Sequence, residues 1–167
     1  MNSQLRTFFA TSVTHQRVSH FHRTRMAELL IETLLHYRDQ RVYRLHDFVV
    51  MPDHFHVILT PSEKLSLERV MQRIKGGFSF RAGKEINPLS AIWQRSFTHH
   101  LILNPEDMEH HHEYVIHNPV RAGLAATPQD YPWSSAQRRF RMDSVDEIYL
   151  NILAGQTFRR REGSNRG

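Results

Sequence analysis

Residues 42–60 read VYRLHDFVVMPDHFHVILT, and this stretch decides the fold that we expect. Both of its halves are rich in β-branched and aromatic residues, which are typical of strands. Pro52-Asp53 lies between the halves and predicts a tight turn, because proline fixes φ and aspartate caps turns. The stretch therefore predicts a β-hairpin whose strands occupy 42–51 and 54–60.

The segments around this hairpin alternate between strand and helix patterns. Residues 7–14 are rich in β-formers and predict a first strand. Apolar residues recur at helical spacing over 21–37 and again over 66–82, so each of these segments predicts an amphipathic helix. Residues 93–103 predict a further strand.

A last helix is expected after Asn104. This asparagine suits an N-cap, Pro105 suits the first helical position, and the acidic residues 106–107 suit the first turn. Pro119 should end the helix at residue 117 or 118, because proline disfavours helical geometry in the residue before it. The order β-α-β-β-α-β-α predicts an α+β, ferredoxin-like fold: an antiparallel sheet covered by two helices on one face, with an added C-terminal helix.

Composition narrows the class of protein. A chain of 167 residues suits one domain with a tail, which we place at 1–136 and 137–167, the tail ending in a basic, flexible segment. The chain has no cysteine, which excludes disulfides, thiolate metal sites and cysteine nucleophiles. It contains no run of about 18 apolar residues and no apolar N-terminal stretch, so we expect a cytoplasmic protein without a membrane segment.

The charge balance points to a nucleic-acid partner. The 22 basic residues outnumber the 17 acidic ones, and the sequence pI is near 10.0. Nearly all of the basic residues are arginine, whose planar guanidinium pairs with phosphate and stacks on bases. An ordinary solvated surface remains the alternative on composition alone.

His54 and His56 are candidate metal ligands. Side chains in a strand alternate between faces, so these two histidines share a face while Phe55 points into the opposite layer. Two imidazoles on one strand face can grip one divalent metal. The alternative is a pair of exposed strand histidines that bind nothing.

Tyr114 and Asn118 form the second candidate pair. They stand one helical turn apart, and hence on one face of the last helix. A phenol with a pKa of about 10 is a poor nucleophile unless a metal or base assists it, and an amide oxygen one turn away could complete a metal shell. The alternatives are a core or surface aromatic for Tyr114 and a helix C-cap for Asn118.

Together these segments resemble the REP-associated tyrosine transposases of the HUH superfamily, in which U is a hydrophobic residue. The resemblance covers residues 7–136, which would then form an HUH-type single-strand DNA transposase domain. It rests on His54-Phe55-His56 and on further segments in the same order and spacing: 43–50 (YRLHDFVV), 75–79 (KGGFS), 93–97 (WQRSF), 113–124 (EYVIHNPVRAGL) and 131–135 (YPWSS).

The resemblance implies a role for each candidate. His54, His56 and Asn118 would hold Mg²⁺ or Mn²⁺, and Tyr114 would attack the scissile phosphate. The product would be a 5′-phosphotyrosine link and a free 3′-hydroxyl, so the last helix would be the catalytic one. The substrate would be single-stranded DNA with a palindromic, REP-like hairpin, and we expect a monomer rather than a homodimer.

The chain departs from the family pattern at one place. Where the family usually has an acidic residue before a histidine, this chain has His99 before His100. If the acidic residue tunes the site or packs the catalytic helix, activity or metal preference would differ here. Three successive helical histidines, residues 110–112, cannot converge on one ion and suit a solvated face. His110 and His117 are close enough to Tyr114 by helical spacing to affect its proton.

Several residues are candidates for DNA contacts. Lys75 lies just before Gly76-Gly77, near an expected helix end that a phosphate could approach closely, and Arg73 lies on the same helix. Trp93 could stack on an unpaired base, as in single-strand binders. The arginines Arg159, Arg160 and Arg161 could grip a DNA stem. An exposed lysine and a core tryptophan are the ordinary alternatives.

The expected function is thus a metal-dependent single-strand DNA endonuclease and strand-transferase. A catalytically silent hairpin-binding protein is one rival, which the departure at His99 keeps open. A metallohydrolase of small phosphoesters is another, and such an enzyme would not need Tyr114.

Overall fold

The computed structural model describes residues 5–85 and 91–145. The main elements follow the order expected from the sequence. They are β1 (Phe8–Val13), α1 (Thr24–Asp39), β2 (Tyr43–Met51), β3 (His54–Pro61), α2 (Leu67–Glu85), β4 (Thr98–Leu101) and α3 (Pro105–Arg121). Short 3-10 turns, η1 (His15–Arg17), η2 (His20–His22) and η3 (Pro128–Asp130), lie between or after them.

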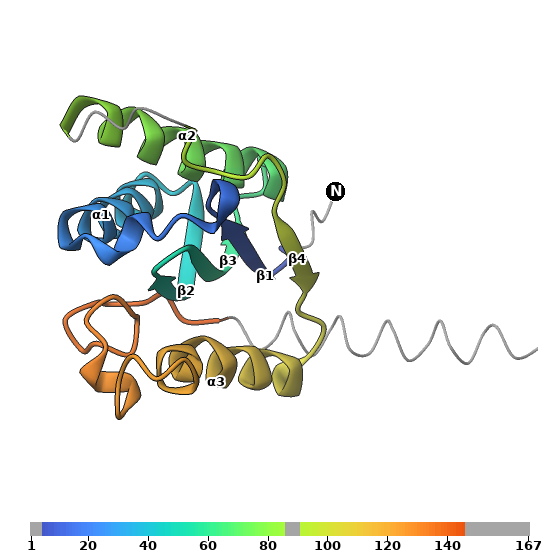
Figure 1. Cartoon of the computed structure of the whole chain (residues 1–167). Helices are drawn as coiled ribbons and strands as arrows, with labels where there is room; N and C mark the ends of the chain where they lie inside the picture. Colours follow the sequence, from blue (N-terminus) through green and yellow to red (C-terminus); the bar gives the residue numbers. More distant parts are fainter. Residues whose placement is uncertain (1–4, 86–90, 146–167) are drawn as a thin grey trace, which may run out of the picture.

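The four strands form one antiparallel sheet in the order β2-β3-β1-β4. The helices α1 and α2 cover one face of this sheet, and α3 lies on the other (Figure 1). This is the ferredoxin-like arrangement with an added helix, so the predicted fold class is confirmed. The hairpin of β2 and β3, joined through Pro52-Asp53, is confirmed as well.

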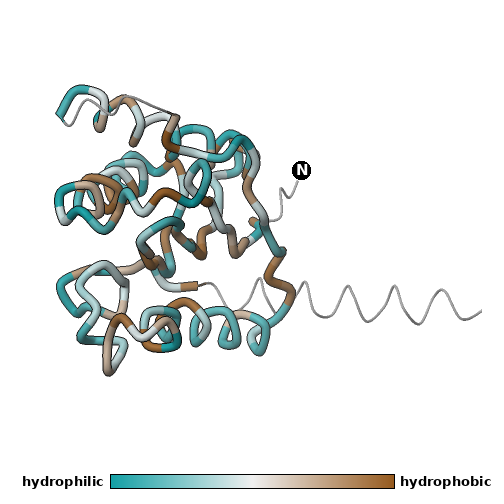
Figure 2. The backbone as a smooth tube through the Cα atoms, viewed as in Figure 1, coloured by the Kyte–Doolittle hydropathy of each residue, from teal (hydrophilic) through white to brown (hydrophobic). Residues whose placement is uncertain are grey.

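Each face of the sheet has its own apolar core. The larger core lies between the sheet and the helices α1 and α2, and Figure 2 shows hydrophobic residues along the central strands that contribute to it. The smaller core lies on the α3 side and consists of Val49, Met51, Ile58, Val115 and Tyr131. Successive residues of a strand point alternately into the two cores, so every second side chain faces α3.

Two of the expected elements have other bounds in the structure. α1 begins at Thr24 rather than near Phe21, because a 3-10 turn at His20–His22 occupies its expected start. The strand expected over 93–103 is only Thr98–Leu101, and Trp93 forms an isolated bridge with Thr14 instead.

The most consequential correction concerns the end of α3. The helix continues through Pro119 to Arg121. Pro119 has no backbone N–H, so the helix lacks the hydrogen bond to the Val115 carbonyl. The backbone N–H of Ala122 still donates to the Asn118 carbonyl. Gly123, with φ of +72°, follows the helix. Asn118 is therefore a helical residue and not the C-cap.

Lys75, Gly76 and Gly77 lie in the middle of α2, not near its end as expected. Gly77 faces α1, and a Cβ atom there would lie 2.8 Å from Cε2 of Tyr37. The glycine thus lets the two helices pack closely. Around Gly76 the equivalent space is open.

The chain beyond α3 returns to β2. The Val50 N–H bonds the Trp133 carbonyl at 2.8 Å, and the Leu45 N–H bonds the Asp143 carboxylate at 2.8 Å. The domain boundary expected at residue 136 stays a prediction. None of the described helices is both long and apolar enough to cross a membrane.

Candidate active site

Strand alternation brings the predicted metal ligands to the face that packs against α3. Thr11 on β1 pairs with His56 on β3, and Val13 pairs with His54, so these side chains form two neighbouring rows. The rings of His54 and His56 have centroids 4.9 Å apart. Phe55, between them, is fully buried in the opposite core, as expected.

Each of the two histidines is held through its Nδ1 atom. Nδ1 of His54 lies 2.6 Å from a carboxylate oxygen of Asp53, and Nδ1 of His56 lies 2.6 Å from the hydroxyl of Thr11. When Nδ1 carries the proton and donates it in these bonds, Nε2 keeps its lone pair. Histidines that ligate metals are commonly oriented by such partners.

Burial keeps His56 neutral. The side chain is 5% exposed, and desolvation, with a smaller contribution from neighbouring His54, lowers its pKa to about 3. A neutral imidazole is the form that binds a metal. Asp53, which contacts His54, is a carboxylate: burial would raise its pKa, but hydrogen bonds from His54 and Arg17 outweigh this and lower it.

α3 carries Tyr114 and Asn118 to the same place. The amide nitrogen of Asn118 lies 3.4 Å from Nε2 of His56, and the Tyr114 ring lies 5.4 Å from the His56 ring. Phe9 packs edge-on against Tyr114 at 5.8 Å, which supports the phenol from the sheet side. His54, Tyr114 and Asn118 thus all lie next to His56.

The donor set fits a divalent metal. With both Nδ1 atoms protonated, the two Nε2 atoms and the amide oxygen of Asn118, after rotation of its amide, make three neutral N and O donors. Such a set suits several first-row divalent ions. The remaining coordination positions would be open to water or to a phosphate oxygen.

Arg121 was not predicted from the sequence as a site residue. Its guanidinium lies 5.1 Å from the centre of the Tyr114 ring, and it donates to the Glu113 carbonyl. It is in place because α3 continues past Pro119, which the sequence analysis did not anticipate. A cation over the ring favours negative charge nearby, on a phenolate or a phosphate.

Of the three successive histidines at 110–112, which we expected to be a solvated face, only His110 is exposed. His111 and His112 are half-buried and pair with carboxylates: His111 with Asp107 at 3.1 Å, and His112 with Asp47 at 2.9 Å. Asp47 is buried and also accepts from Ser135. Helical periodicity alone could not show these partners, because they come from distant segments or from the start of the helix.

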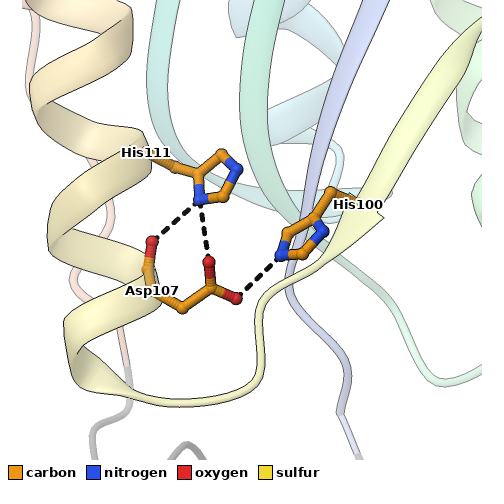
Figure 3. A group of neighbouring side chains, drawn as sticks. All are labelled: His100, Asp107 and His111. Atoms are coloured by element: carbon orange, nitrogen blue, oxygen red, sulfur yellow. Dashed lines mark hydrogen bonds and ion pairs between the residues drawn. The ribbon is translucent and has the colours of Figure 1, made fainter.

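His100, Asp107 and His111 form a separate cluster (Figure 3). The carboxylate of Asp107 lies between the two imidazoles, and the rings of His100 and His111 stack at 4.7 Å. In contrast, His99 pairs with Ala10 and contacts Phe8 and Phe97 on the α2 side of the sheet. The departure at His99 therefore neither touches the site nor packs against α3.

The predicted DNA-binding residues have varied surroundings. Lys75 donates to the Gln94 carbonyl at 2.6 Å, which ties α2 to the segment before β4. Trp93 packs against Phe21, Phe55 and Phe78, as a core aromatic does. Arg73 is exposed on α2. The arginines at 159–161 lie outside the described residues.

Comparison with known proteins gives consistent matches. The family of IS200-like transposases matches residues 7–118. The REP-associated tyrosine transposase of Escherichia coli K12 is 30% identical over 132 residues, 78% of this chain and 76% of that relative. A solved structure of a REP-associated tyrosine transposase bound to a REP hairpin aligns with a TM-score of 0.69 and 27% identity, covering 87% of this chain and 88% of that one.

Proposed function

The chain belongs to the IS200-like transposase family, and on that premise we propose that it cuts and rejoins single-stranded DNA through a covalent link to Tyr114. The observation that carries this proposal is the meeting of His54, His56, Tyr114 and Asn118 on one side of the sheet. They come from β3 and from α3, two elements that the fold packs together.

In the proposed reaction the phenol oxygen of Tyr114 attacks the scissile phosphorus. The phenol loses its proton, the bond from phosphorus to the 3′-oxygen breaks, and the leaving oxygen gains a proton to become a 3′-hydroxyl. The DNA is left with a 5′-phosphotyrosine link that keeps the energy of the phosphodiester. Attack by a 3′-hydroxyl on that link reverses the step and joins strands without a nucleotide cofactor.

His54, His56 and Asn118 are the residues that would hold Mg²⁺ or Mn²⁺. Bound there, either ion supplies a Lewis acid that polarises the scissile phosphate and orients it. Thr11 and Asp53 would keep the two imidazoles aimed at the ion, and Arg121 would stabilise negative charge next to Tyr114.

We further propose a REP-like palindromic hairpin as the DNA partner. The structurally similar relative is described as bound to a REP hairpin, and it covers most of this chain. The basic composition, with a formal charge of +5, suits a DNA partner. We assign the transposase activity to residues 1–136 and a supporting role to 137–167, and we propose a monomer. Lys75, Arg73, Trp93 and the arginines 159–161 remain the candidates for contacts to DNA.

The test uses a labelled single-stranded hairpin, the protein with Mn²⁺, and a denaturing gel. A protein-linked DNA band that needs metal and vanishes in Tyr114→Phe is the expected result, because the substitution removes only the nucleophilic oxygen. Glu106→Gln, an exposed change two turns away on the same helix, serves as the matched control and should keep the band.

Other outcomes separate the rival functions. Hairpin binding without any adduct, across several hairpins and both metals, would favour a silent binding protein. Cleavage that persists in Tyr114→Phe would identify water as the nucleophile and favour a hydrolase.

A further inference from the structure

We propose that His100, Asp107 and His111 form a second metal site, for a transition metal of the zinc class, that joins β4 to the start of α3. The three residues offer one donor atom each, and these atoms all lie within 4.8 Å of one another. Figure 3 shows that they come from two elements: His100 from β4, and Asp107 and His111 from α3.

The spacing on α3 suits a metal chelate. Asp107 and His111 stand at i and i+4, so both side chains lie on one face of the helix and can bind the same ion. The third donor approaches from the neighbouring strand, where Nε2 of His100 lies 2.8 Å from the Asp107 carboxylate. Donors from two separate elements make a site that is set by the fold and not by one flexible segment.

The donor chemistry favours zinc over magnesium. Two imidazoles and one carboxylate suit zinc and its neighbours, whereas Mg²⁺ prefers a shell of oxygen atoms. The Asp107 carboxylate is ready to ligate: burial would raise its pKa, but hydrogen bonds from His100 and from the Leu103 N–H outweigh this and lower it.

The present distances are close to those that a metal needs. Nε2 of His100 lies 2.8 Å from one carboxylate oxygen of Asp107, and Nδ1 of His111 lies 3.1 Å from the other. Ligand atoms around a tetrahedral zinc stand about 3.4 Å apart. Because the three donor atoms already lie within 4.8 Å of one another, rotation of the side chains alone would admit the ion. His100 Nε2 would release the proton that it donates to the Asp107 carboxylate, and His111 Nδ1 would release the one that it donates to the Asp107 backbone carbonyl.

This site is separate from the proposed active site. The Phe9 ring lies between them, 4.9 Å from the His111 ring on one side and 5.2 Å from the His56 ring on the other. The two sites share no residue, so the second stands whether or not Tyr114 cuts DNA. An ion bound there would fix α3 to β4 one turn before Tyr114.

The experiment is a calorimetric titration of untagged protein with Zn²⁺, and Co²⁺ absorption provides a second readout of tetrahedral nitrogen and oxygen ligation. Wild type should bind one ion at this site in addition to any at His54 and His56. His100→Gln should weaken the extra binding by at least about tenfold. Its side chain is 47% exposed, so the variant is expected to fold.

Two matched variants identify the site. His99 precedes His100 in β4 and points to the other face of the sheet, so His99→Gln should still bind the extra ion. His54→Gln alters the proposed active site and should keep it too. The proposal is overturned if wild type binds no ion beyond those lost in His54→Gln, or if His100→Gln binds zinc as wild type does.

Discussion

Thr11→Val is predicted to reduce DNA cleavage by about 10- to 100-fold, because the Thr11 hydroxyl orients a ligating histidine. The substitution keeps the shape of the side chain but removes the oxygen that lies 2.6 Å from Nδ1 of His56. His56 is 5% exposed, so water cannot replace that partner freely. In Thr11→Val, Nδ1 of His56 is buried without a partner, which costs about 1–3 kcal/mol of folding free energy. For a chain of this size each kcal/mol lowers Tm by about 2–4 °C.

The assay combines thermal unfolding with the rate of adduct formation over a series of Mn²⁺ concentrations. Thr7→Val is the matched control, because Thr7, just before β1, makes a buried hydroxyl contact of 2.7 Å with Thr60 on β3, away from the site. Both variants should lose stability, but only Thr11→Val should lose cleavage and need more Mn²⁺. If Thr11→Val is destabilised yet cleaves as fast as Thr7→Val, His56 is not a metal ligand that Thr11 orients.

Other consequences can be measured without DNA. Gly76→Ala, in open space, should stabilise the fold by about 0.5–1 kcal/mol in urea unfolding, because alanine favours a helix interior. Gly77→Ala should be about 1–3 kcal/mol less stable than Gly76→Ala, because its Cβ would lie 2.8 Å from Cε2 of Tyr37. Equal effects at the two positions would contradict the close packing of α1 on α2. The hydrogen bond with Asp47 raises the pKa of His112 above 6.5, so this pair stabilises the fold fully below pH 6.5 and less as the pH rises through the raised pKa. The Tm of wild type should therefore exceed that of His112→Gln most at about pH 5.5 and least at about pH 8.5, and a gap that widens with pH would refute the assignment.

Local sequence patterns predicted the helices and strands well, because each helix or strand depends mainly on residues close together in the sequence. Apolar spacing and turn residues located every main helix and strand, and strand alternation correctly placed His54 and His56 on one face. Partners that are distant in sequence were missed. Thr11 meets His56 only because β1 lies beside β3, and no local pattern carries that register. The end of α3 was wrong for another reason: a proline in the last turn removes one hydrogen bond, and the remaining bonds keep the helix intact.

Polar pairs help to hold α3 in place, because this helix buries few apolar side chains. α1 has seven buried residues, whereas α3 has only Val115 and Pro119. The contacts of His111 with Asp107 and of His112 with Asp47 lie on α3 within a turn of Tyr114. Substitutions in α1 should therefore act mainly on global stability. Loss of the Asp47 pair should instead loosen α3 locally, and amide hydrogen exchange in Asp47→Asn should rise in α3 well before it rises in α1.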